Sequence, residues 1–187
     1  MSNSFILENT VIPSVRDLKQ LSMALKSVSP IILLSETHIG NLQSLTRKCH
    51  ESNKKVIVHL DLVGGLNKDP IGLKMLRDLF KVDGIISPNV KIINQAKDLG
   101  LFSIHRLFLL DSRSLETGLK STNGSQLDAI EVLPGPFAKN FIEQIKTYKK
   151  APVLAGGFIS AKEDVKELFN AGFHGITTSS SELWKTK

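Results

Sequence analysis

Short apolar runs alternate with amphipathic segments along the whole chain. This alternation is typical of parallel βα units, in which a buried strand is followed by a helix that packs on the sheet. The predicted strands are Val11–Val15, Ile31–Leu34, Val56–Leu62, Gly84–Ser87, Phe102–Leu110, Ala129–Leu133, Pro152–Ala155 and Gly175–Thr177. Roughly eight parallel strands are enough to close a sheet on itself. We therefore predict an α/β fold, a single compact (β/α)8 TIM-type barrel domain over residues 1–187.

An open, doubly wound sheet is the alternative architecture. Such a sheet would usually show a glycine-rich dinucleotide turn after its first strand, and residues 13–17 contain no glycine. A barrel of 187 residues requires short helices and loops, because barrels of this class usually take about 250 residues.

Capping and stop signals set the predicted helix boundaries. Helices are predicted from Asp17 to Ser27, from His38 to Glu51, after Asp69 and Pro70, from Asn89 to Gly100, after Asp111 or Ser112, and from Gly135 to Tyr148. Ser160 and Glu163 are placed to form a capping box for a helix that ends at Gly172. A last helix is predicted to start within Thr178–Ser181 and to run through Trp184.

Two loops near the C-terminus have the composition of an anion site. One follows the predicted strand at Pro152–Ala155 and contains Gly156 and Gly157, and the other begins at Thr178 and Ser179. Glycine lets an anion approach the backbone, and helix starts and hydroxyls supply hydrogen-bond donors. In (β/α)8 barrels a phosphate commonly sits between the last two βα loops, so the pair predicts a phosphate site. The alternative is that the glycines relieve crowding and the hydroxyls are solvated caps.

The ends of the predicted strands bring polar side chains to one mouth of the barrel, because all βα loops converge there. His59 and Asp61, two residues apart, are expected to lie on one strand and to enter the lumen together. The candidate ligand-binding residues at this mouth are Arg16, Glu36, Asp61, Arg106, Glu131, Gly156, Gly157, Thr178 and Ser179.

Arg106 interrupts the apolar run of its strand. A guanidinium in such a position is costly unless it is paired, so its partner is expected to be a carboxylate such as Asp61 or Glu131, or a ligand phosphate. The alternative is an internal salt bridge with Glu131 that only fixes the floor of the barrel.

Composition narrows the function classes only slightly. The 24 Lys and Arg against 18 Asp and Glu give a formal net charge of +6, which favours anionic ligands or polyanions without proving nucleic-acid binding. The single cysteine, Cys49, excludes a disulfide framework within the chain and indicates a reducing compartment. No apolar run fits a signal peptide or a membrane span, so we expect a cytoplasmic protein without a membrane partner.

The catalytic chemistry available to these residues is limited. No lysine ends a strand, and the histidines lack the spacing of metal ligands, so we expect no Schiff base, no metal and no cofactor. Cys49 is expected to be a half-buried or helix-surface residue rather than an activated thiol. Glu36, Asp61 and Glu131 leave one enzymatic alternative, a small phosphate-binding isomerase or phosphodiesterase. An inactive barrel that assembles with a partner is a third interpretation.

Seven short motifs occur in order along the chain: PSVRD at Pro13, HIG at His38, VHLDLVGG at Val56, RLFLLDS at Arg106, IEVLPG at Ile130, AGGFI at Ala155 and TTSSSELW at Thr177. Together they resemble the glycerol uptake operon antiterminator family, the glycerol-3-phosphate-responsive regulators of bacterial glycerol genes. The resemblance covers nearly the whole chain, from Ile12 to Trp184.

The resemblance implies a non-enzymatic, RNA-binding barrel. With glycerol 3-phosphate bound, such a protein would stabilise a leader mRNA and let polymerase pass a terminator. A homodimer is one candidate for its assembly. It places the phosphate of the effector at the four loop residues Gly156, Gly157, Thr178 and Ser179. It places the glycerol hydroxyls near Asp61, Arg106 and Glu131.

The RNA surface is not visible in the sequence. No RNA-reading signature is present, and the basic clusters are expected to be solvated faces opposite the mouth. They are Lys146, Lys149 and Lys150, with Lys54 and Lys55.

Overall fold

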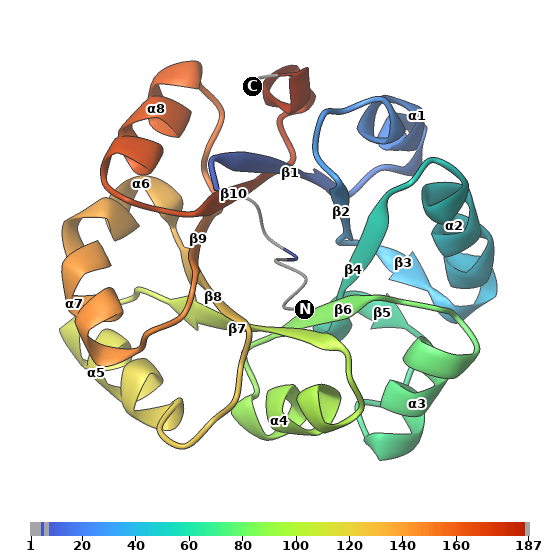
Figure 1. Ribbon diagram of the computed structural model, residues 1–187, viewed down its shortest axis with the longest axis horizontal. Coiled ribbons are helices and arrows are strands. Elements are labelled where there is room, and N and C mark those ends of the chain that lie inside the picture. The colour runs from blue at the N-terminus through green and yellow to red at the C-terminus, as the bar shows by residue number, and fades with distance from the viewer. Residues whose placement is uncertain (1–4, 6–7, 186–187) are drawn as a thin grey trace.

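A closed barrel of parallel strands forms the centre of the protein, and helices surround it (Figure 1). The structure is a computed structural model that describes residue 5 and residues 8–185. Around the barrel the order is β1, β2, β4, β6, β7, β8, β9 and β10, and β10 pairs with β1 to close it. The predicted (β/α)8 TIM-type barrel is confirmed. Its strands are β1 (Thr10–Val15), β2 (Ile31–Leu34), β4 (Lys55–His59), β6 (Gly84–Ser87), β7 (Phe102–Phe108), β8 (Ala129–Leu133), β9 (Val153–Gly156) and β10 (Gly175–Thr178).

The helices follow the strands in the predicted order and are short, as the length of the chain requires. None of those within residues 8–185 combines the length and apolar character needed to cross a membrane. The α-helices are α1 (Leu21–Leu25), α2 (Ile39–Glu51), α3 (Pro70–Asp78), α4 (Val90–Asp98), α5 (Ser112–Ser121), α6 (Gly135–Ala138), α7 (Ile142–Tyr148) and α8 (Lys162–Asn170). Single-turn 3-10 helices are η1 (Leu18–Gln20), η2 (Leu60–Leu62), η3 (Lys139–Phe141) and η4 (Ser181–Lys185).

Side chains that point into the barrel fill it in layers. Successive strand residues point to opposite sides, so every second residue faces the interior. An apolar layer is made of Ile12, Ile31, Leu33, Ile57, Ile86, Ile104, Ala129 and Leu154. Two residues nearer the mouth, the inward positions on several strands are polar. We call the following six residues the polar layer: Ser14, Ser35, His59, Arg106, Glu131 and Thr177.

The third predicted strand is too long. The observed strand, β4, ends at His59, and Leu60–Leu62 forms the 3-10 turn η2. The next two residues, β5 (Val63–Gly64), pair with β3 (Thr37–His38) in a separate two-stranded sheet. The prediction that His59 and Asp61 lie on one strand is therefore wrong, because pairing with β3 draws the chain away from the barrel wall.

Several helix boundaries also differ from the predictions. The capping box of α8 uses Asp164, whose carboxylate accepts from the backbone N–H groups of Ser160 and Ala161 at 3.2 and 3.0 Å. Glu163 does not supply the cap. Thr178 ends β10, and the predicted last helix is only the turn η4. The segments 17–27 and 135–148 are each divided into short α and 3-10 turns, and β7 ends two residues earlier than predicted.

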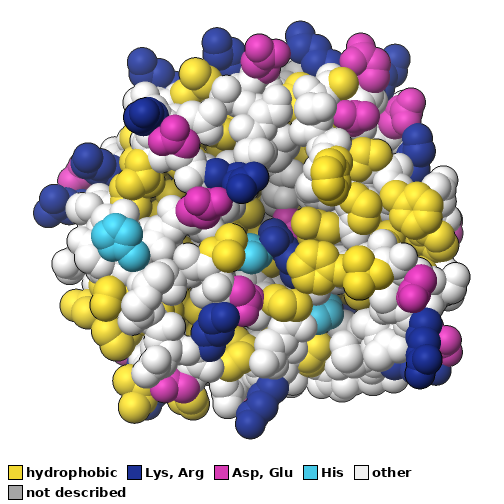
Figure 2. All heavy atoms as spheres, turned by 180° about the vertical axis from the view of Figure 1, so that it is seen from behind, with side chains coloured by type: hydrophobic (Ala, Val, Ile, Leu, Met, Phe, Trp, Pro, Cys, Tyr) yellow, Lys and Arg dark blue, Asp and Glu magenta, His cyan; other side chains and the backbone are white. Residues whose placement is uncertain are grey.

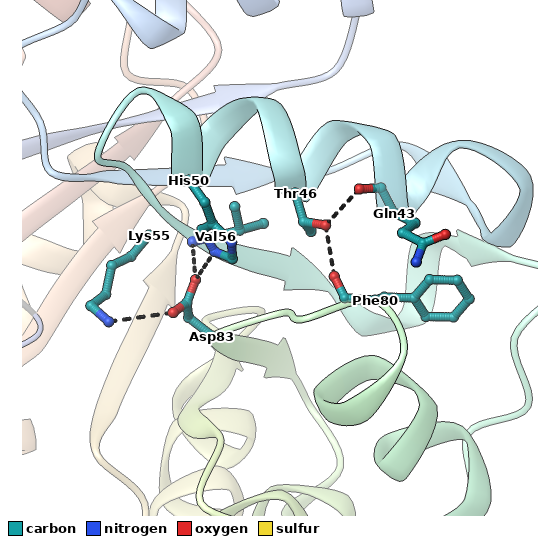
Figure 3. A network of polar contacts seen from close by, with 7 residues as sticks. All are labelled: Gln43, Thr46, His50, Lys55, Val56, Phe80 and Asp83. Carbon is teal, nitrogen blue, oxygen red and sulfur yellow. Dashed lines mark hydrogen bonds and ion pairs between the residues drawn. The ribbon is translucent and has the colours of Figure 1, made fainter.

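An ionic network at the start of β6 joins three elements (Figure 3). The carboxylate of Asp83 accepts from the backbone N–H of Val56 at 2.8 Å. It also lies 2.8 Å from the Nε2 atom of His50 and 3.3 Å from the Nζ atom of Lys55. The network ties α2 and β4 to the start of β6, so Lys55 is part of the fold.

Two further lysines of the predicted basic clusters also serve the fold. Lys54 donates to the carbonyl oxygens of Ser27 and Ser29 at 2.6 and 2.7 Å. Lys149 donates in the same way to Thr122 and Ser125 at 3.2 and 2.7 Å. Such bonds satisfy backbone oxygens at turns. The clusters are therefore not simply solvated faces.

Cys49 is fully buried in α2, not half-buried or on the helix surface as predicted. Burial, with a smaller contribution from Asp83, raises the pKa of this thiol to about 11. A thiol in this state is inert rather than activated.

Candidate functional site

A pocket of about 580 Å³ opens above the polar layer, at the ends of the barrel strands. Figure 2 looks from behind Figure 1, and it shows cationic, acidic and histidine side chains near the centre of that face, with hydrophobic side chains gathered to one side. We call the 580 Å³ pocket the mouth pocket. Its lining residues are Ser14, Arg16, Ser35, Glu36, His59, Leu62, Arg106, Leu133, Gly157, Phe158, Ile159, Ser160, Thr177, Thr178, Ser179 and Ser180.

Most of the residues predicted from the sequence line this one pocket. They come from five strands of the barrel or from the loops after them, namely β1, β2, β7, β9 and β10, so only the fold brings them together. The structure places six of the nine candidates in the lining: Arg16, Glu36, Arg106, Gly157, Thr178 and Ser179. The remaining three, Asp61, Glu131 and Gly156, lie nearby but do not line it.

Arg106 pairs with Glu131, the second of the two carboxylates considered from the sequence. Its Nε atom lies 2.6 Å from Oε2 of Glu131, whose side chain is fully buried. The other carboxylate oxygen, Oε1, accepts from the hydroxyl of Thr177 at 2.5 Å. The ion pair lies in the polar layer below the mouth and not at the barrel floor. The terminal nitrogens of Arg106 have no partner within the described chain, and Arg106 lines the mouth pocket.

Gly156 is required by packing against this ion pair. A Cβ atom at this position would lie 2.6 Å from Oγ1 of Thr177 and 2.8 Å from Oε1 of Glu131. Both distances are shorter than real contacts, so any side chain here would displace the polar layer. At this position a glycine is explained by the close packing of Thr177 and Glu131, which was the alternative to an anion-binding role for Gly156.

Asp61 and Glu36 are each engaged at the rim. Asp61 accepts from the hydroxyl of Ser87 at 2.9 Å and lies 3.2 Å from Nζ of Lys68. Glu36 lies 3.2 Å from Nε of Arg16, and both of these side chains are exposed. Across the described residues, no group of His, Cys, Asp or Glu side chains is arranged to hold a metal ion.

The two C-terminal loops are fastened to each other. Thr178 donates its hydroxyl to the carbonyl oxygen of Ile159 at 2.6 Å and accepts from the N–H of Ser180 at 3.0 Å. The indole N–H of Trp184 donates to the carbonyl oxygen of Thr178 at 2.9 Å. The hydroxyl of Thr178 thus holds the loops in register, while that of Ser179 has no partner in the described part of the chain.

The first of these loops has an unusual backbone. Gly157 has a φ of 74° and Phe158 a φ of 58°, two consecutive residues in the left-handed region. That conformation is easy for glycine and uncommon for phenylalanine, so the loop is held by its surroundings. The side chain of Phe158 is 87% exposed beside the pocket. The role of Gly157 as open backbone for an anion stays a prediction.

The sequence prediction missed several lining residues. Ser14 and Ser35 hydrogen-bond each other at 2.7 Å in the polar layer, and Thr177 supports Glu131. A spacing signal was present for the two serines, because they follow Ile12 and Leu33 of the apolar layer by two positions. Ser180 continues the hydroxyl run that begins at Thr178, and it also lines the pocket.

Two histidines of the barrel strands are buried: His59, which lines the mouth pocket, and His105, which does not. Burial and then the nearby positive charge of Arg106 lower the pKa of His59 to about 4; the carboxylate of Asp61 opposes this shift, and Lys68 adds a smaller lowering effect. Burial lowers the pKa of His105 to about 4 despite a hydrogen bond to the backbone of Ser87. Both rings are therefore neutral at pH 7.

These two histidines predict loss of stability in acid. In the unfolded chain each titrates near pH 6.5, whereas the folded protein resists protonation until about pH 4. Between these values the unfolded state binds more protons, so stability falls as pH decreases, by roughly 3 kcal/mol per histidine. Urea unfolding at pH 7, 6, 5 and 4 measures the slope. Replacing both His59 and His105 with glutamine should remove most of it, and an unchanged slope would contradict the assignment.

The chain matches the sequence profile of a protein family described as "Glycerol-3-phosphate responsive antiterminator" over residues 11–184. The chain belongs to this family. The family resemblance inferred from the seven motifs is confirmed, and the match covers every strand of the barrel from Val11 onward.

Two solved antiterminator structures share the whole barrel. The glycerol uptake operon antiterminator regulatory protein of Listeria monocytogenes str. 4b F2365 is 31% identical, with a TM-score of 0.89 over 100% of this chain and 98% of that one. A glycerol uptake operon antiterminator-related protein of Thermotoga maritima MSB8 is 26% identical, with a TM-score of 0.85 over 95% and 99%. YgcP, an uncharacterized protein of Escherichia coli (strain K12), is 30% identical over 95% of this chain and 92% of its own length. Membership of this antiterminator family supports a regulatory role for the chain.

Proposed function

We propose that this antiterminator binds glycerol 3-phosphate in the mouth pocket and, in that state, binds and stabilises the leader mRNA of glycerol-utilisation genes in the cytoplasm. The observation that supports the proposal most is the meeting of Gly157, Ser179 and Arg106 around one pocket in a chain of this family. These residues supply open backbone, a hydroxyl and a guanidinium, which together suit a phosphate monoester.

The charges around the pocket fit a small dianion. Arg106 donates its Nε–H group to Glu131. The N–H groups of its two terminal nitrogens remain, and a guanidinium can donate two parallel hydrogen bonds to two phosphate oxygens. Ser179 and Ser180 add hydroxyl donors, and Gly157 lets an oxygen approach the main chain. The pocket, at about 580 Å³, is ample for a three-carbon phosphate ester.

Binding of the effector must favour an RNA-competent state for regulation to occur. An effector shifts an equilibrium only through its different affinity for the two states. The loops joined by Thr178 are the element for such a shift, because they line the phosphate site and also carry the exposed Phe158. Occupancy of the site would thereby be transmitted to the outer surface of the mouth.

The proposal is tested by measuring binding of the leader transcript of the organism's own glycerol-utilisation genes. Affinity should fall steeply as salt rises, because RNA binding releases counterions, and it should increase on addition of glycerol 3-phosphate at each salt concentration. The variant Ser179→Asp should bind RNA without responding to the effector. A flat response of the unmodified protein would contradict the proposal. Release of glycerol 3-phosphate from glycerophosphodiesters with Mg²⁺, lost in Asp61→Asn, would instead establish the enzymatic alternative.

A further inference from the structure

His59 is the exception among the six residues of the polar layer. Ser14 and Ser35 bond each other at 2.7 Å, and Glu131 bonds both Arg106 and Thr177. The ring of His59 has no hydrogen-bond partner at either Nδ1 or Nε2. The other five members of the layer each make at least one hydrogen bond within the protein, and the ring of His59 makes none.

The unpartnered ring is enclosed and lines the mouth pocket. His59 is 7% exposed, and both ring nitrogens are shielded from solvent. A neutral imidazole has one donor and one acceptor nitrogen, and leaving both unpaired in a buried site is unfavourable. His105 also has an unpartnered Nδ1 atom, but it lies on the outward-facing side of β7, next to the inward-facing Ile104, and does not line the pocket.

The charged groups near His59 are Arg106, Lys68 and Asp61. Arg106 and Lys68 disfavour a second positive charge on the ring, and Asp61 is engaged by Ser87 and Lys68. A phosphate dianion only accepts hydrogen bonds, so it could pair with the donor nitrogen of a neutral ring but would leave the acceptor nitrogen unpaired. A hydroxyl group, which is both donor and acceptor, matches the ring.

We propose that His59 hydrogen-bonds a hydroxyl group of the ligand in the mouth pocket, so that the pocket selects a phosphate monoester with a hydroxylated carbon chain over one with a plain alkyl chain. The inference rests on the proposed function, because it assumes that the phosphate occupies the loops at Gly157 and Ser179. His59, in the polar layer, would then contact the hydroxylated carbon chain of the ligand, at the end opposite the phosphate. It is a specificity-determining residue for the effector.

The test compares two ligands of equal charge and carbon number, glycerol 3-phosphate and n-propyl phosphate, by calorimetry. The unmodified protein should bind glycerol 3-phosphate at least about tenfold more tightly, the value of one well-made hydrogen bond in a buried site. In His59→Phe this ratio should fall towards one, mainly through weaker binding of glycerol 3-phosphate. His59→Gln should keep part of the ratio, because its amide also donates and accepts.

His105→Phe is the matched control. Like His59, His105 is a buried histidine whose ring has an unpartnered nitrogen, and the substitution is the same. Its ligand ratio should equal that of the unmodified protein. If His59→Phe does not fold, ¹⁵N NMR of the His59 ring in the unmodified protein replaces it. Its ring nitrogen signals should shift with glycerol 3-phosphate and stay in place with n-propyl phosphate.

The outcomes separate this inference from the proposed function. If glycerol 3-phosphate binds but the ratio survives in His59→Phe, or the ring signals respond to both ligands alike, the inference is wrong while the proposed function stands. If the unmodified protein binds neither ligand, the proposed function fails and the inference fails with it.

Discussion

Replacing Ser179 with aspartate is expected to weaken glycerol 3-phosphate binding by at least about a hundredfold. Ser179 lines the mouth pocket with a free hydroxyl, so the new carboxylate would face the phosphate directly. Two like charges about 4 Å apart near a protein surface repel by a few kcal/mol, enough for such a loss. Titration calorimetry at moderate ionic strength measures the change.

Two companion variants separate charge repulsion from other effects. Ser179→Ala removes only the hydroxyl and should cost about tenfold or less. Ser44→Asp places the same charge on the exposed surface of α2, away from the pocket, and should change affinity by less than about twofold. Equal affinities in Ser179→Asp and the unmodified protein would show that the phosphate binds elsewhere.

Replacing Glu131 with leucine is expected to destabilise the protein by about 3–5 kcal/mol. Glu131 is fully buried and holds both Arg106 and Thr177. Its loss would leave the guanidinium of Arg106, whose side chain is only 13% exposed, without a counter-charge in the barrel. The midpoint of urea denaturation at pH 7 measures the effect.

A double variant, Glu131→Leu with Arg106→Met, is the control for this interpretation. Replacing both members of a buried ion pair with apolar residues is often close to neutral, so most of the lost stability should return. The double variant should nevertheless fail to bind glycerol 3-phosphate, because the guanidinium is gone. If Glu131→Leu alone unfolds at the same urea concentration as the unmodified protein, the ion pair does not support the barrel.

The alternation of apolar and amphipathic segments was sufficient to predict the barrel. Each strand is short and bounded by polar or turn residues, so the order of the elements could be determined locally. The residues at which the strands and helices end could not be predicted from the local sequence. The strand at Val56 stops at His59 because Val63 and Gly64 pair with β3, and that pairing depends on residues far away in the chain. Asp61 therefore lies in a turn, where its partners are Ser87 and Lys68.

The candidate site was predictable where the chain itself repeats a pattern. Gly157 and Ser179 follow β9 and β10, which pair directly, so their loops lie side by side at one pocket. Partner choice was harder to predict, because Asp61 and Glu131 were equally plausible partners for Arg106 until the register set Arg106 beside Glu131. The isolation of His59 is likewise a property of the assembled layer, which no local motif encodes.

A crystal structure with glycerol 3-phosphate bound is the most direct measurement of the central claim. We expect the phosphate group between the loops of Gly157 and Ser179, within hydrogen-bond distance of the terminal nitrogens of Arg106. A phosphate seated on any other surface, or a mouth pocket left empty at a saturating concentration of the ligand, would contradict the account.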